Sequence, residues 1–321
     1  MIVLQAGVPK SGNLWLYQIL ESVRAEAGLA RRRFITGHPI YEQARSWPLS
    51  YPEQASVDVL DFERGRAFCR ISSRFREEVS DLAGYCAQAS HVWTHSEITD
   101  ADLPQLVRFD RIVYILRDPR DVAVSMARFA FTPYMRAHYP HRSRSAETYL
   151  QRHLTKLTKY WVRHVGSWLR QQGRVALYFV CYERLLADFE GELRRLLGFL
   201  DLELDAAARQ RVAAAVSFSA MRKSRPDHLR AGQSGGWRVS LGRAQVAEVL
   251  EIAAPVLQLL GYPLDTGSVA QLPAVPERLD PTVLASATAA GRYTAVERWR
   301  DRAGQARGQL RHALARFGTR G

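Results

Sequence analysis

The sequence predicts an α/β fold in which helices flank a central parallel sheet. Short apolar runs of strand length alternate along the chain with longer segments whose apolar residues recur every three or four positions. The first apolar run leads through a glycine-containing loop into a helical segment, which predicts a P-loop-like strand–loop–helix unit that binds an anion. With 321 residues, of which 47% are hydrophobic, the chain can form one large α/β domain with a substantial core.

The individual elements follow from these patterns. Buried strands are expected where apolar residues are continuous, over residues 2–6, 90–94, 111–116 and 175–180. Helices are expected over residues 13–23, from about residue 122, and over residues 146–170, 189–200, 206–216 and 243–260. Prolines interrupt residues 31–90, so loops and short helices are expected there, lining a pocket together with residues 128–146.

The chain is expected to divide into a main domain (1–262), a proline-bearing linker (263–281) and a basic helical extension (282–321). In the extension, one helical face is formed by Val296, Trp299, Ala303, Ala306, Leu310, Ala313 and Phe317. Eight arginines between Arg292 and Arg320 face only Glu297 and Asp301. The extension either docks on the main domain with a solvated basic face, or recruits an anionic partner such as an acidic small molecule, a carrier protein or a membrane.

Composition narrows the class of protein. The sequence has no apolar run of about 18 residues, so no membrane span is expected. The N-terminus lacks the basic start and cleavage site of a secretory signal, which predicts a cytoplasmic protein. Cys69, Cys86 and Cys181 are odd in number and widely spaced, so we expect reduced thiols and no zinc site. A net charge of +13 predicts an anionic ligand without identifying it.

The sharpest motif is the loop that follows the first strand, residues 7–15 (GVPKSGNLW). Backbone N–H groups at a helix N-terminus attract anions, Lys10 adds a positive charge, and Gly12 allows close approach. Ser11 and Asn13 can donate further hydrogen bonds. The lysine precedes the second glycine, so the spacing is not that of a Walker A loop. The alternative is an ordinary turn with a surface lysine.

Two further segments carry anion-binding residues. Arg117 ends the expected strand 111–116, where its forked guanidinium suits a phosphate, and Ser125 lies two turns into the next helix. The alternative is a charged turn in which Arg117 pairs with a carboxylate, and Arg120 and Asp121 are interpreted as structural. Residues 229–237 (LRAGQSGGW) form a glycine-rich loop, which by itself is more typical of a protein surface.

His95 is the candidate general base among the nine histidines. It follows the expected strand 90–94, which places it at the same carboxyl edge of the sheet as Lys10 and Arg117. A lone histidine is more often structural. His38, His138 and His141 could instead touch the acceptor, although each is more typical of a solvated loop. No cluster of His, Asp and Glu has metal-ligand spacing, so no metal is expected.

Together these motifs resemble those of the cytosolic sulfotransferases, enzymes that use 3′-phosphoadenosine-5′-phosphosulfate (PAPS) and release 3′-phosphoadenosine 5′-phosphate (PAP). Residues 9–15 resemble the P-K-S-G-T-T-W loop that binds the 5′-phosphosulfate and stacks its tryptophan on adenine. The corresponding residues here are Lys10, Ser11, Gly12, Asn13, Leu14 and Trp15. The resemblance extends in order from residue 1 to about residue 262.

The same resemblance implies roles for the other motifs. Arg117 and Ser125 match the residues that bind the 3′-phosphate. Residues 230–237 resemble the R-K-G-x-x-G-D-W loop that closes over this phosphate, and the matching residues are Arg230, Gly232, Gly235 and Trp237. The cofactor-binding positions implied in this loop are Arg230, Ala231 and Gly232. The neighbours of adenine are implied to be Tyr182, Phe218 and Met221. His95 matches the catalytic base of the K-T-H segment, with Lys10 stabilising the leaving phosphate.

Five positions depart from the family pattern. Asn13 and Leu14 replace two threonines, Trp93 replaces the lysine beside the base, and Ala231 and Gly236 replace a lysine and an aspartate in the closing loop. Leu14 cannot offer a side-chain hydrogen bond to phosphate. The effects of these changes on PAPS affinity and on rate do not follow from the sequence.

The resemblance implies in-line transfer of a sulfuryl group from PAPS, without a metal, to a hydroxyl or amine of a small-molecule or carbohydrate acceptor. One alternative is a nucleotide-dependent kinase with an atypical phosphate loop, although no magnesium ligands are evident. Another is a non-catalytic binder of anionic polymers, although no specific nucleic-acid motif is present. The identity of the acceptor and the oligomeric state stay open.

Overall fold

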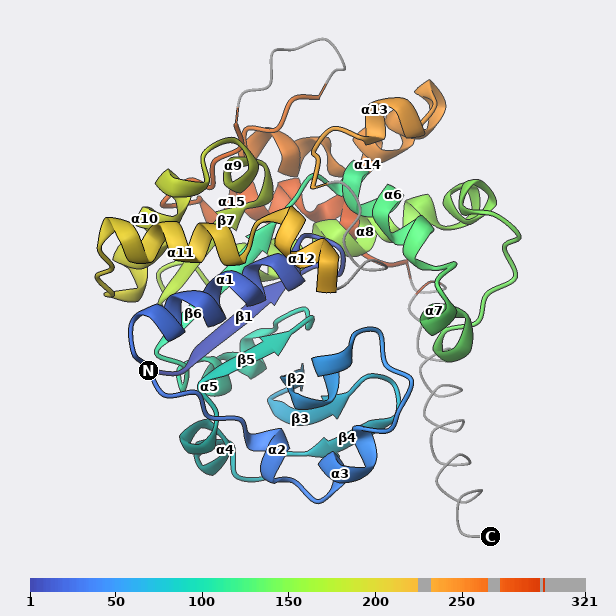
Figure 1. Cartoon of the computed structure of the whole chain (residues 1–321). Coiled ribbons are helices and arrows are strands. Elements are labelled where there is room, and N and C mark those ends of the chain that lie inside the picture. The colour runs from blue at the N-terminus through green and yellow to red at the C-terminus, as the bar shows by residue number, and fades with distance from the viewer. Residues whose placement is uncertain (225–231, 265–271, 295–296, 298–321) are drawn as a thin grey trace, which may run out of the picture.

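The computed structural model describes residues 1–224, 232–264, 272–294 and 297, and it contains a seven-stranded sheet at its centre (Figure 1). The strands lie in the order β4-β3-β2-β5-β1-β6-β7. Their bounds are β1 Val3–Gly7, β2 Asp58–Glu63, β3 Arg66–Ile71, β4 Phe75–Glu78, β5 His91–Thr94, β6 Arg111–Leu116 and β7 Leu177–Cys181. Strands β2, β5, β1, β6 and β7 run parallel, whereas β3 and β4 continue the sheet in antiparallel fashion. The predicted α/β class with a mainly parallel sheet is therefore confirmed.

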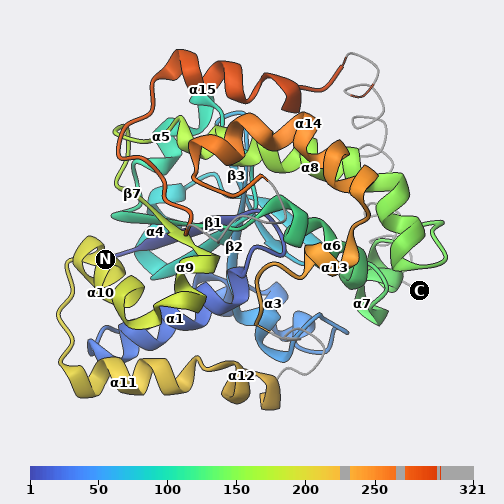
Figure 2. The same cartoon turned by 90° about the horizontal axis from the view of Figure 1, so that it is seen from above.

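Helices cover both faces of the sheet (Figure 2). On one face lie α1 (Asn13–Glu26), α9 (Tyr182–Ala187), α10 (Phe189–Leu200), α11 (Ala206–Ala215) and α12 (Phe218–Ser224). On the other lie α6 (Pro119–Phe129), α8 (Ala146–Leu169), α14 (Arg243–Leu259) and α15 (Pro281–Ala287). Shorter helices at the periphery are α2 (Phe34–Gly37), α3 (Ile40–Ala44), α4 (Leu82–Gln88), α5 (Leu103–Leu106), α7 (Pro133–His138) and α13 (Trp237–Ser240), and 3-10 turns are η1 (Pro52–Ser56), η2 (Asp100–Asp102) and η3 (Ala289–Gly291).

The central strands bury both of their faces, which is why they read as continuous apolar runs. Successive side chains point to opposite sides of a strand. Accordingly, Val113 and Ile115 of β6 pack in one core cluster with α1 and α10, whereas Ile112 and Tyr114 pack in a second cluster with Trp161 of α8. The two cores hold β1, β5 and β6 in place, and the carboxyl ends of these strands carry the predicted site.

The expectation of loops and short helices for residues 31–90 is wrong over residues 58–78. The structure has η1 and the helices α2 and α3 there, but residues 58–78 form β2, β3 and β4. Charged residues stand among the buried ones in these strands, and some of them pair with one another, as Arg76 Nη2 of β4 does with Glu63 Oε2 of β2 at 2.8 Å. Because many charged residues interrupt the run, it lacks the apolar continuity used to identify the other strands.

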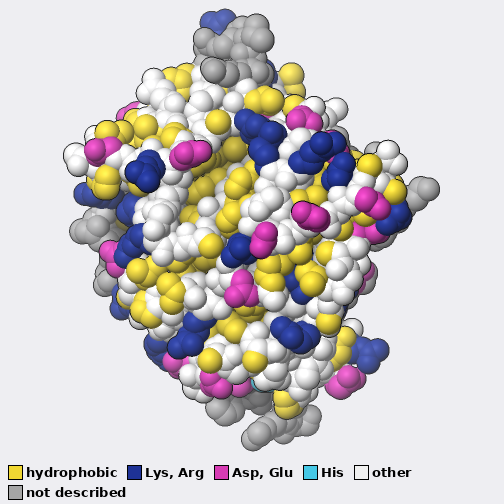
Figure 3. Space-filling model, turned by 90° about the vertical axis from the view of Figure 1, so that its left-hand side faces the viewer, with side chains coloured by type: hydrophobic (Ala, Val, Ile, Leu, Met, Phe, Trp, Pro, Cys, Tyr) yellow, Lys and Arg dark blue, Asp and Glu magenta, His cyan; other side chains and the backbone are white. Residues whose placement is uncertain are grey.

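Charges of both signs are interspersed on the face that carries α10 and α11 (Figure 3). Several of them are paired: Glu190 accepts from Arg194 and Arg209, each at 2.8 Å, and Arg211 lies 2.7 Å from Glu26 of α1. Exposed pairs of this kind contribute little stability. They do mean that the net positive charge does not form one continuous basic patch on this face, as a binder of anionic polymers would use. In the described residues, no helix is long and apolar enough to cross a membrane.

Helix α15, at the start of the expected C-terminal extension, packs on the main domain. Asp280 caps it by accepting hydrogen bonds from the N–H groups of Thr282 and Val283, and Leu284 and Ala287 are buried. Gly291 follows so close to α8 that a Cβ there would lie 2.6 Å from Val162. The greater part of the expected arginine-rich face, residues 298–321, lies outside the described residues.

Leu284→Ala is therefore expected to lower the free energy of unfolding by about 2–5 kcal/mol, because it empties a site in which the side chain is 2% exposed. The matched control is Val283→Ala on the same helix, where the side chain is 48% exposed and a change within about 0.5 kcal/mol is expected. Urea unfolding followed by tryptophan fluorescence measures both. Equal effects of the two substitutions would contradict the packing of α15 against the core.

Candidate active site

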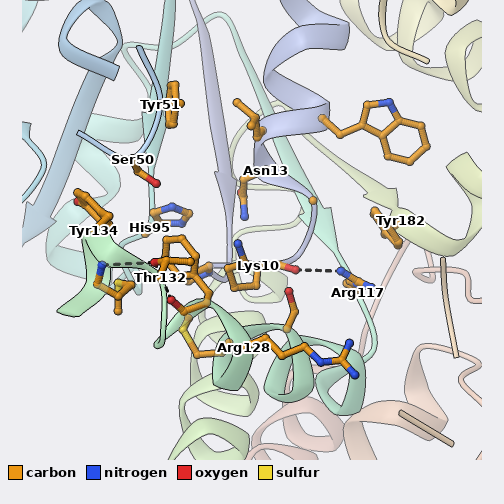
Figure 4. A pocket seen from close by; sticks show the side chains of 18 of the residues that line it. Lys10, Asn13, Ser50, Tyr51, His95, Arg117, Arg128, Thr132, Tyr134 and Tyr182 are labelled. Carbon is orange, nitrogen blue, oxygen red and sulfur yellow. Dashed lines mark hydrogen bonds between the residues drawn. The ribbon is translucent and has the colours of Figure 1, made fainter. Parts of the chain in front are cut away.

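Three parallel neighbouring strands, β5, β1 and β6, end at the same edge of the sheet. The register pairs Ala6 with Thr94 and Gly7 with Ile115. The residues that follow these strands therefore meet around one cavity of about 630 Å³. Lys10 lies between His95 on one side and Arg117 on the other (Figure 4).

Most of the predicted site residues line this cavity: Lys10, Gly12, Asn13, Leu14, Trp15, His95, Arg117, Ser125, Tyr182, Phe218 and Gly232. Ser11 and Met221 are buried and are not among the residues that line it. Arg230 and Ala231 lie outside the described residues. The structure thus brings together residues from the three motifs that are far apart in the sequence.

The loop between β1 and α1 is held open by its backbone geometry. Lys10 and Gly12 both have positive φ, 75° and 100°, and a Cβ on Gly12 would lie 2.6 Å from the Tyr182 ring. A non-glycine residue with such a φ costs on the order of 1–2 kcal/mol, which points to a functional constraint at Lys10. The Ser11 hydroxyl is buried without a hydrogen-bond partner among the described residues. A buried hydroxyl of this kind needs a ligand or a water as its partner.

Asn13, expected to face a phosphate, braces the loop in this structure. Its Nδ2 donates to the Val8 carbonyl at 2.7 Å, and its own backbone carbonyl accepts from Gln5 Nε2 at 2.7 Å. The side chain that replaces a family threonine therefore contributes to the shape of the loop. The N–H groups at the start of α1 stay available for an anion.

Lys10 is the central cation of the cavity. Its Nζ lies 3.9 Å from the centroid of the Phe129 ring, in a cation–π contact. Burial, and secondarily the positive charge of Arg117, lowers the Lys10 pKa from 10.5 to about 8. Two cations in one buried cavity repel each other, and an anionic ligand between them removes that penalty.

Arg117 joins two of the predicted motifs. Its Nη1 donates to the Lys10 carbonyl at 3.2 Å and its Nη2 donates to the Gln233 carbonyl of the glycine-rich loop at 3.1 Å. The guanidinium also lies 4.1 Å from the centroid of the Tyr182 ring. Its buried Nε has no hydrogen-bond partner among the described residues, so one donor is left for a ligand.

The residues next to Arg117 fix the glycine-rich loop, as their interpretation as structural residues predicts. The Asp121 carboxylate accepts from the N–H groups of Gly235 at 2.7 Å and Trp237 at 3.0 Å. Arg120 is fully buried, binds the Asp118 carboxylate and lies 3.8 Å over the Trp237 ring. These contacts connect α6 to the loop and hold Gly232 and Gln233 beside the cavity.

His95 is held in one tautomer and one orientation. Its Nδ1 lies 2.6 Å from the Gly7 carbonyl oxygen, which can only accept, so Nδ1 carries the proton and Nε2 has a free lone pair. Burial mainly, together with the charges of Arg70 and Lys10, lowers the His95 pKa to about 4. The ring is consequently neutral near pH 7 and can accept a proton.

A second layer of hydrogen bonds holds the backbone of His95. Its carbonyl oxygen accepts from the Tyr160 hydroxyl and from His164 Nε2, both at 3.2 Å. The other ring nitrogen of His164 accepts from the Tyr114 hydroxyl at 2.8 Å. Burial lowers the His164 pKa to about 3, so this histidine positions the site in its neutral form.

Aromatic rings form one end of the cavity. The Trp15 ring lies 4.7 Å from Phe218 and 5.6 Å from Tyr182, measured between centroids. Trp15 Nε1 donates to the Val216 carbonyl at 3.0 Å, which fixes the plane of the indole. Flat apolar surfaces with fixed planes suit a stacked base.

Apart from Trp93, the opposite end is formed by residues that the sequence did not single out. They come from the 3-10 turn η1 and its flanks, from β2, β3 and β5, and from α7 and its flanks: Ser50, Tyr51, Gln54, Val59, Arg70, Ser72, Trp93, Thr132, Tyr134, Met135 and Tyr139. The expectation that residues 31–90 and 128–146 line a pocket is confirmed. Tyr51 and Tyr134 lie on the same side of Lys10 as His95 (Figure 4).

Two of the departures from the family pattern meet in this end of the cavity. Leu14 and Trp93 belong to one apolar cluster with Tyr17, Tyr51 and Val57. Leu14 and Trp93 therefore make this part of the cavity wall apolar. Among the described residues, no group of three or more His, Cys, Asp or Glu side chains is placed to hold a metal ion.

Comparison with known proteins identifies the family of this chain. A family model described as the sulfotransferase domain matches residues 2–261, and the chain therefore belongs to the sulfotransferase family. Human sulfotransferase 2B1 is 25% identical over 254 residues, which cover 72% of this chain and 59% of that protein. Rat sulfotransferase 2B1 is 28% identical over 254 residues, covering 72% and 63%. The chain thus spans less than two thirds of the length of these curated relatives.

Solved structures show the same fold. Mouse sulfotransferase SULT7A1 in complex with PAP is 18% identical with a TM-score of 0.52, and the match covers 80% of this chain and 84% of that one. Retinol dehydratase in complex with androsterone and the inactive cofactor PAP is 20% identical with a TM-score of 0.54, covering 80% of each chain.

Proposed function

We propose that this protein is a sulfotransferase that moves the sulfuryl group of PAPS to a hydroxyl, or an amine, of a small-molecule acceptor. The observation that carries the proposal is the convergence of Lys10, His95 and Arg117 on one cavity at the carboxyl edge of three parallel strands. The proposal is supported by the neutral ring of His95 beside the two cations, because sulfuryl transfer needs a base for the acceptor and positive charge for the leaving phosphate.

The residues present fit the nucleotide. The loop N–H groups, Lys10 and the unpartnered Ser11 hydroxyl would hold the 5′-phosphosulfate. Arg117 and Ser125, with Arg230 from the closing loop, would hold the 3′-phosphate and distinguish PAPS from ATP. Trp15, Tyr182 and Phe218 would take the adenine, with Met221 beneath them. PAPS supplies the activated sulfuryl group.

His95 would act on the acceptor. Its Nε2 lone pair takes the proton of the attacking hydroxyl, while the Nδ1–H bond to Gly7 keeps the ring oriented and supports the positive charge that forms. Lys10 would stabilise the negative charge that accumulates on the departing phosphate. The Tyr160, His164 and Tyr114 bonds hold the His95 backbone in position.

The lining of the acceptor end favours an acceptor with an apolar, ring-containing body over a carbohydrate. Tyr51, Trp93, Tyr134 and Met135 present mostly apolar surface there. The structural relatives crystallised with androsterone and with retinol support the same preference, because both of these molecules are apolar. A sulfotransferase with this lining would sulfate a small molecule.

The proposal is tested by incubating the purified protein with PAPS and a panel of phenols, alcohols, amines and sugars, followed by mass spectrometry. The expected result is an acceptor that gains one sulfuryl group, in the presence of EDTA as well as magnesium. Transfer of phosphate from ATP that requires magnesium would favour a kinase instead. Binding to heparin that disappears in moderate salt, without affinity for PAP, would favour a polymer binder.

The affinity for PAP is expected to fall as the pH rises through about 8. Lys10 has a pKa of about 8 in the free protein, and the nearby anion raises that pKa, so binding above pH 8 requires uptake of a proton. The dissociation constant, measured by calorimetry at fixed ionic strength between pH 7 and 9.5, should be flat at first and then increase. This range avoids the second ionisation of the phosphate near pH 6.

The matched variant for this prediction is Lys10→Arg, whose guanidinium stays charged over the whole range. Its dissociation constant should lose the increase above pH 8. A wild-type dissociation constant that is constant up to pH 9.5 would show that Lys10 does not bind the nucleotide as a cation.

A further inference from the structure

Arg70 brings a positive charge into the acceptor end of the cavity, where the surrounding side chains are uncharged aromatic, aliphatic and polar ones. It lies on β3 and lines the cavity together with Ser72, Tyr134 and Tyr139. Its side chain is 23% exposed. Lys10 and Arg117 lie beside the phosphate loop, and Arg128 is an exposed residue of α6 that donates to Ser240 at 3.2 Å. Arg70 therefore requires a separate explanation.

The guanidinium is fixed by two of its three nitrogens. Its Nε lies 3.0 Å from both carboxylate oxygens of Asp61, and its Nη1 donates to the Ser72 carbonyl at 3.2 Å. Its Nη2 makes no hydrogen bond to the part of the chain that the structure describes. The fork is thus oriented by the protein while one edge, with two N–H donors, is left for a ligand.

Neighbouring hydroxyls enlarge this donor set. The Ser72 hydroxyl lies 2.5 Å from the Tyr134 hydroxyl, and the Tyr139 phenol is close enough to Arg70 for the two to interact electrostatically. The charge of Arg70 also reaches His95, where it contributes to the lowered pKa of the base. Arg70 and His95 both line the one cavity, so a molecule bound there can contact the two residues at once.

Resting on the sulfotransferase function proposed above, we propose that Arg70 selects acceptors that carry a carboxylate. The carboxylate binds the free edge of Arg70, with hydroxyl donors beside it, and the acceptor hydroxyl lies at His95 Nε2. The ring between these two groups packs against Tyr51 and Trp93. The substrate class is therefore a hydroxyaryl carboxylate, a molecule with a phenol at one end and an acid at the other.

The competing explanation is a purely structural ion pair, since Arg70 and Asp61 face each other across β3 and β2. The same hairpin offers a matched control. Arg76 on β4 also faces Asp61, at 3.6 Å, and pairs with Glu63 at 2.8 Å, but it is not among the residues that line the cavity. If Arg70 had only a structural role, substitution of Arg70 and substitution of Arg76 would affect the choice between acceptors in the same way.

The test compares 3-(4-hydroxyphenyl)propanoate with its methyl ester. The homologous acids with a shorter and a longer side chain are each compared with their own methyl ester. For each pair, kcat/KM is measured with PAPS in the wild type, in Arg70→Met and in Arg76→Met. Wild type and Arg76→Met are expected to prefer the acid roughly 10-fold to 100-fold, as a charge-assisted hydrogen bond gives. Arg70→Met is expected to lose this preference through a higher KM for the acid.

In Arg70→Met the Asp61 carboxylate loses its ion-pair partner, and this loss could destabilise the variant. The double variant Asp61→Asn with Arg70→Met is the control, because it removes both charges together. It should also lose the preference while PAP affinity and thermal unfolding stay near wild type. A wild-type enzyme that sulfates the ester as well as the acid, or an acid preference that survives in both Arg70 variants, overturns the role of Arg70. Absence of sulfuryl transfer to every acceptor, neutral ones included, would instead overturn the proposed function.

Discussion

Replacing His95 by alanine is expected to lower kcat by about 10²- to 10⁴-fold, which is the usual contribution of a general base. Burial keeps the ring neutral near pH 7, its Nδ1 donates to the Gly7 carbonyl at 2.6 Å, and its Nε2 keeps the lone pair that would take the proton of the acceptor. The dissociation constant for PAP should stay near the wild-type value, because His95 lies on the acceptor side of Lys10 (Figure 4). Single-turnover kinetics and calorimetry measure the two quantities separately.

The control for this substitution is His153→Ala on α8, a half-buried histidine that does not line the cavity. Its activity should be unchanged. A second signature is the pH dependence of the wild type: with a His95 pKa of about 4, kcat/KM should be level between pH 7 and 5 and fall as the pH approaches 4, because the base then becomes protonated. A His95→Ala protein with more than about a tenth of wild-type activity would refute the assignment.

The sequence was sufficient to predict that Lys10, His95 and Arg117 lie at one edge of the sheet, because each of them follows a parallel strand. Continuous apolar runs mark β1, β5 and β6, and neighbouring parallel strands end at one edge, so Lys10, His95 and Arg117 had to lie close together. The phosphate loop could also be predicted, because it lies between a strand with a continuous apolar run and a helix whose apolar residues recur at helical spacing.

The acceptor end could not be predicted in the same way. Arg70 and Ser72 enter the cavity through the antiparallel strands β2, β3 and β4, in which charged residues interrupt the apolar pattern. The contact of Leu14 with Trp93 depends on the pairing of β1 with β5 and on the packing of α1, across 79 positions of sequence. The orientation of the Asn13 side chain was also inaccessible, because an amide can serve either a phosphate or the backbone, and only the turn geometry decides between them.

Arg117→Ala is expected to weaken the binding of PAP much more than that of adenosine 5′-phosphosulfate, which lacks the 3′-phosphate. A charge-assisted hydrogen bond contributes about 1.5–3 kcal/mol, so PAP should lose roughly 10- to 150-fold in affinity. The substitution also removes the bonds from Arg117 to the carbonyls of Lys10 and Gln233, which steady both loops. A smaller loss, common to both ligands, is therefore expected on top of the difference.

Two further variants separate the specific effect from the general one. Arg117→Lys keeps the charge but not the fork, so PAP affinity should be intermediate between wild type and Arg117→Ala. Arg111→Ala lies at the opposite end of the same strand, where its Nε donates to the Phe199 carbonyl at 2.9 Å, and should leave both affinities unchanged. Calorimetric titration of each variant with each ligand gives the comparison. If Arg117→Ala weakened both ligands equally, Arg117 would serve only to join the two loops, and the 3′-phosphate would have to be bound by other residues.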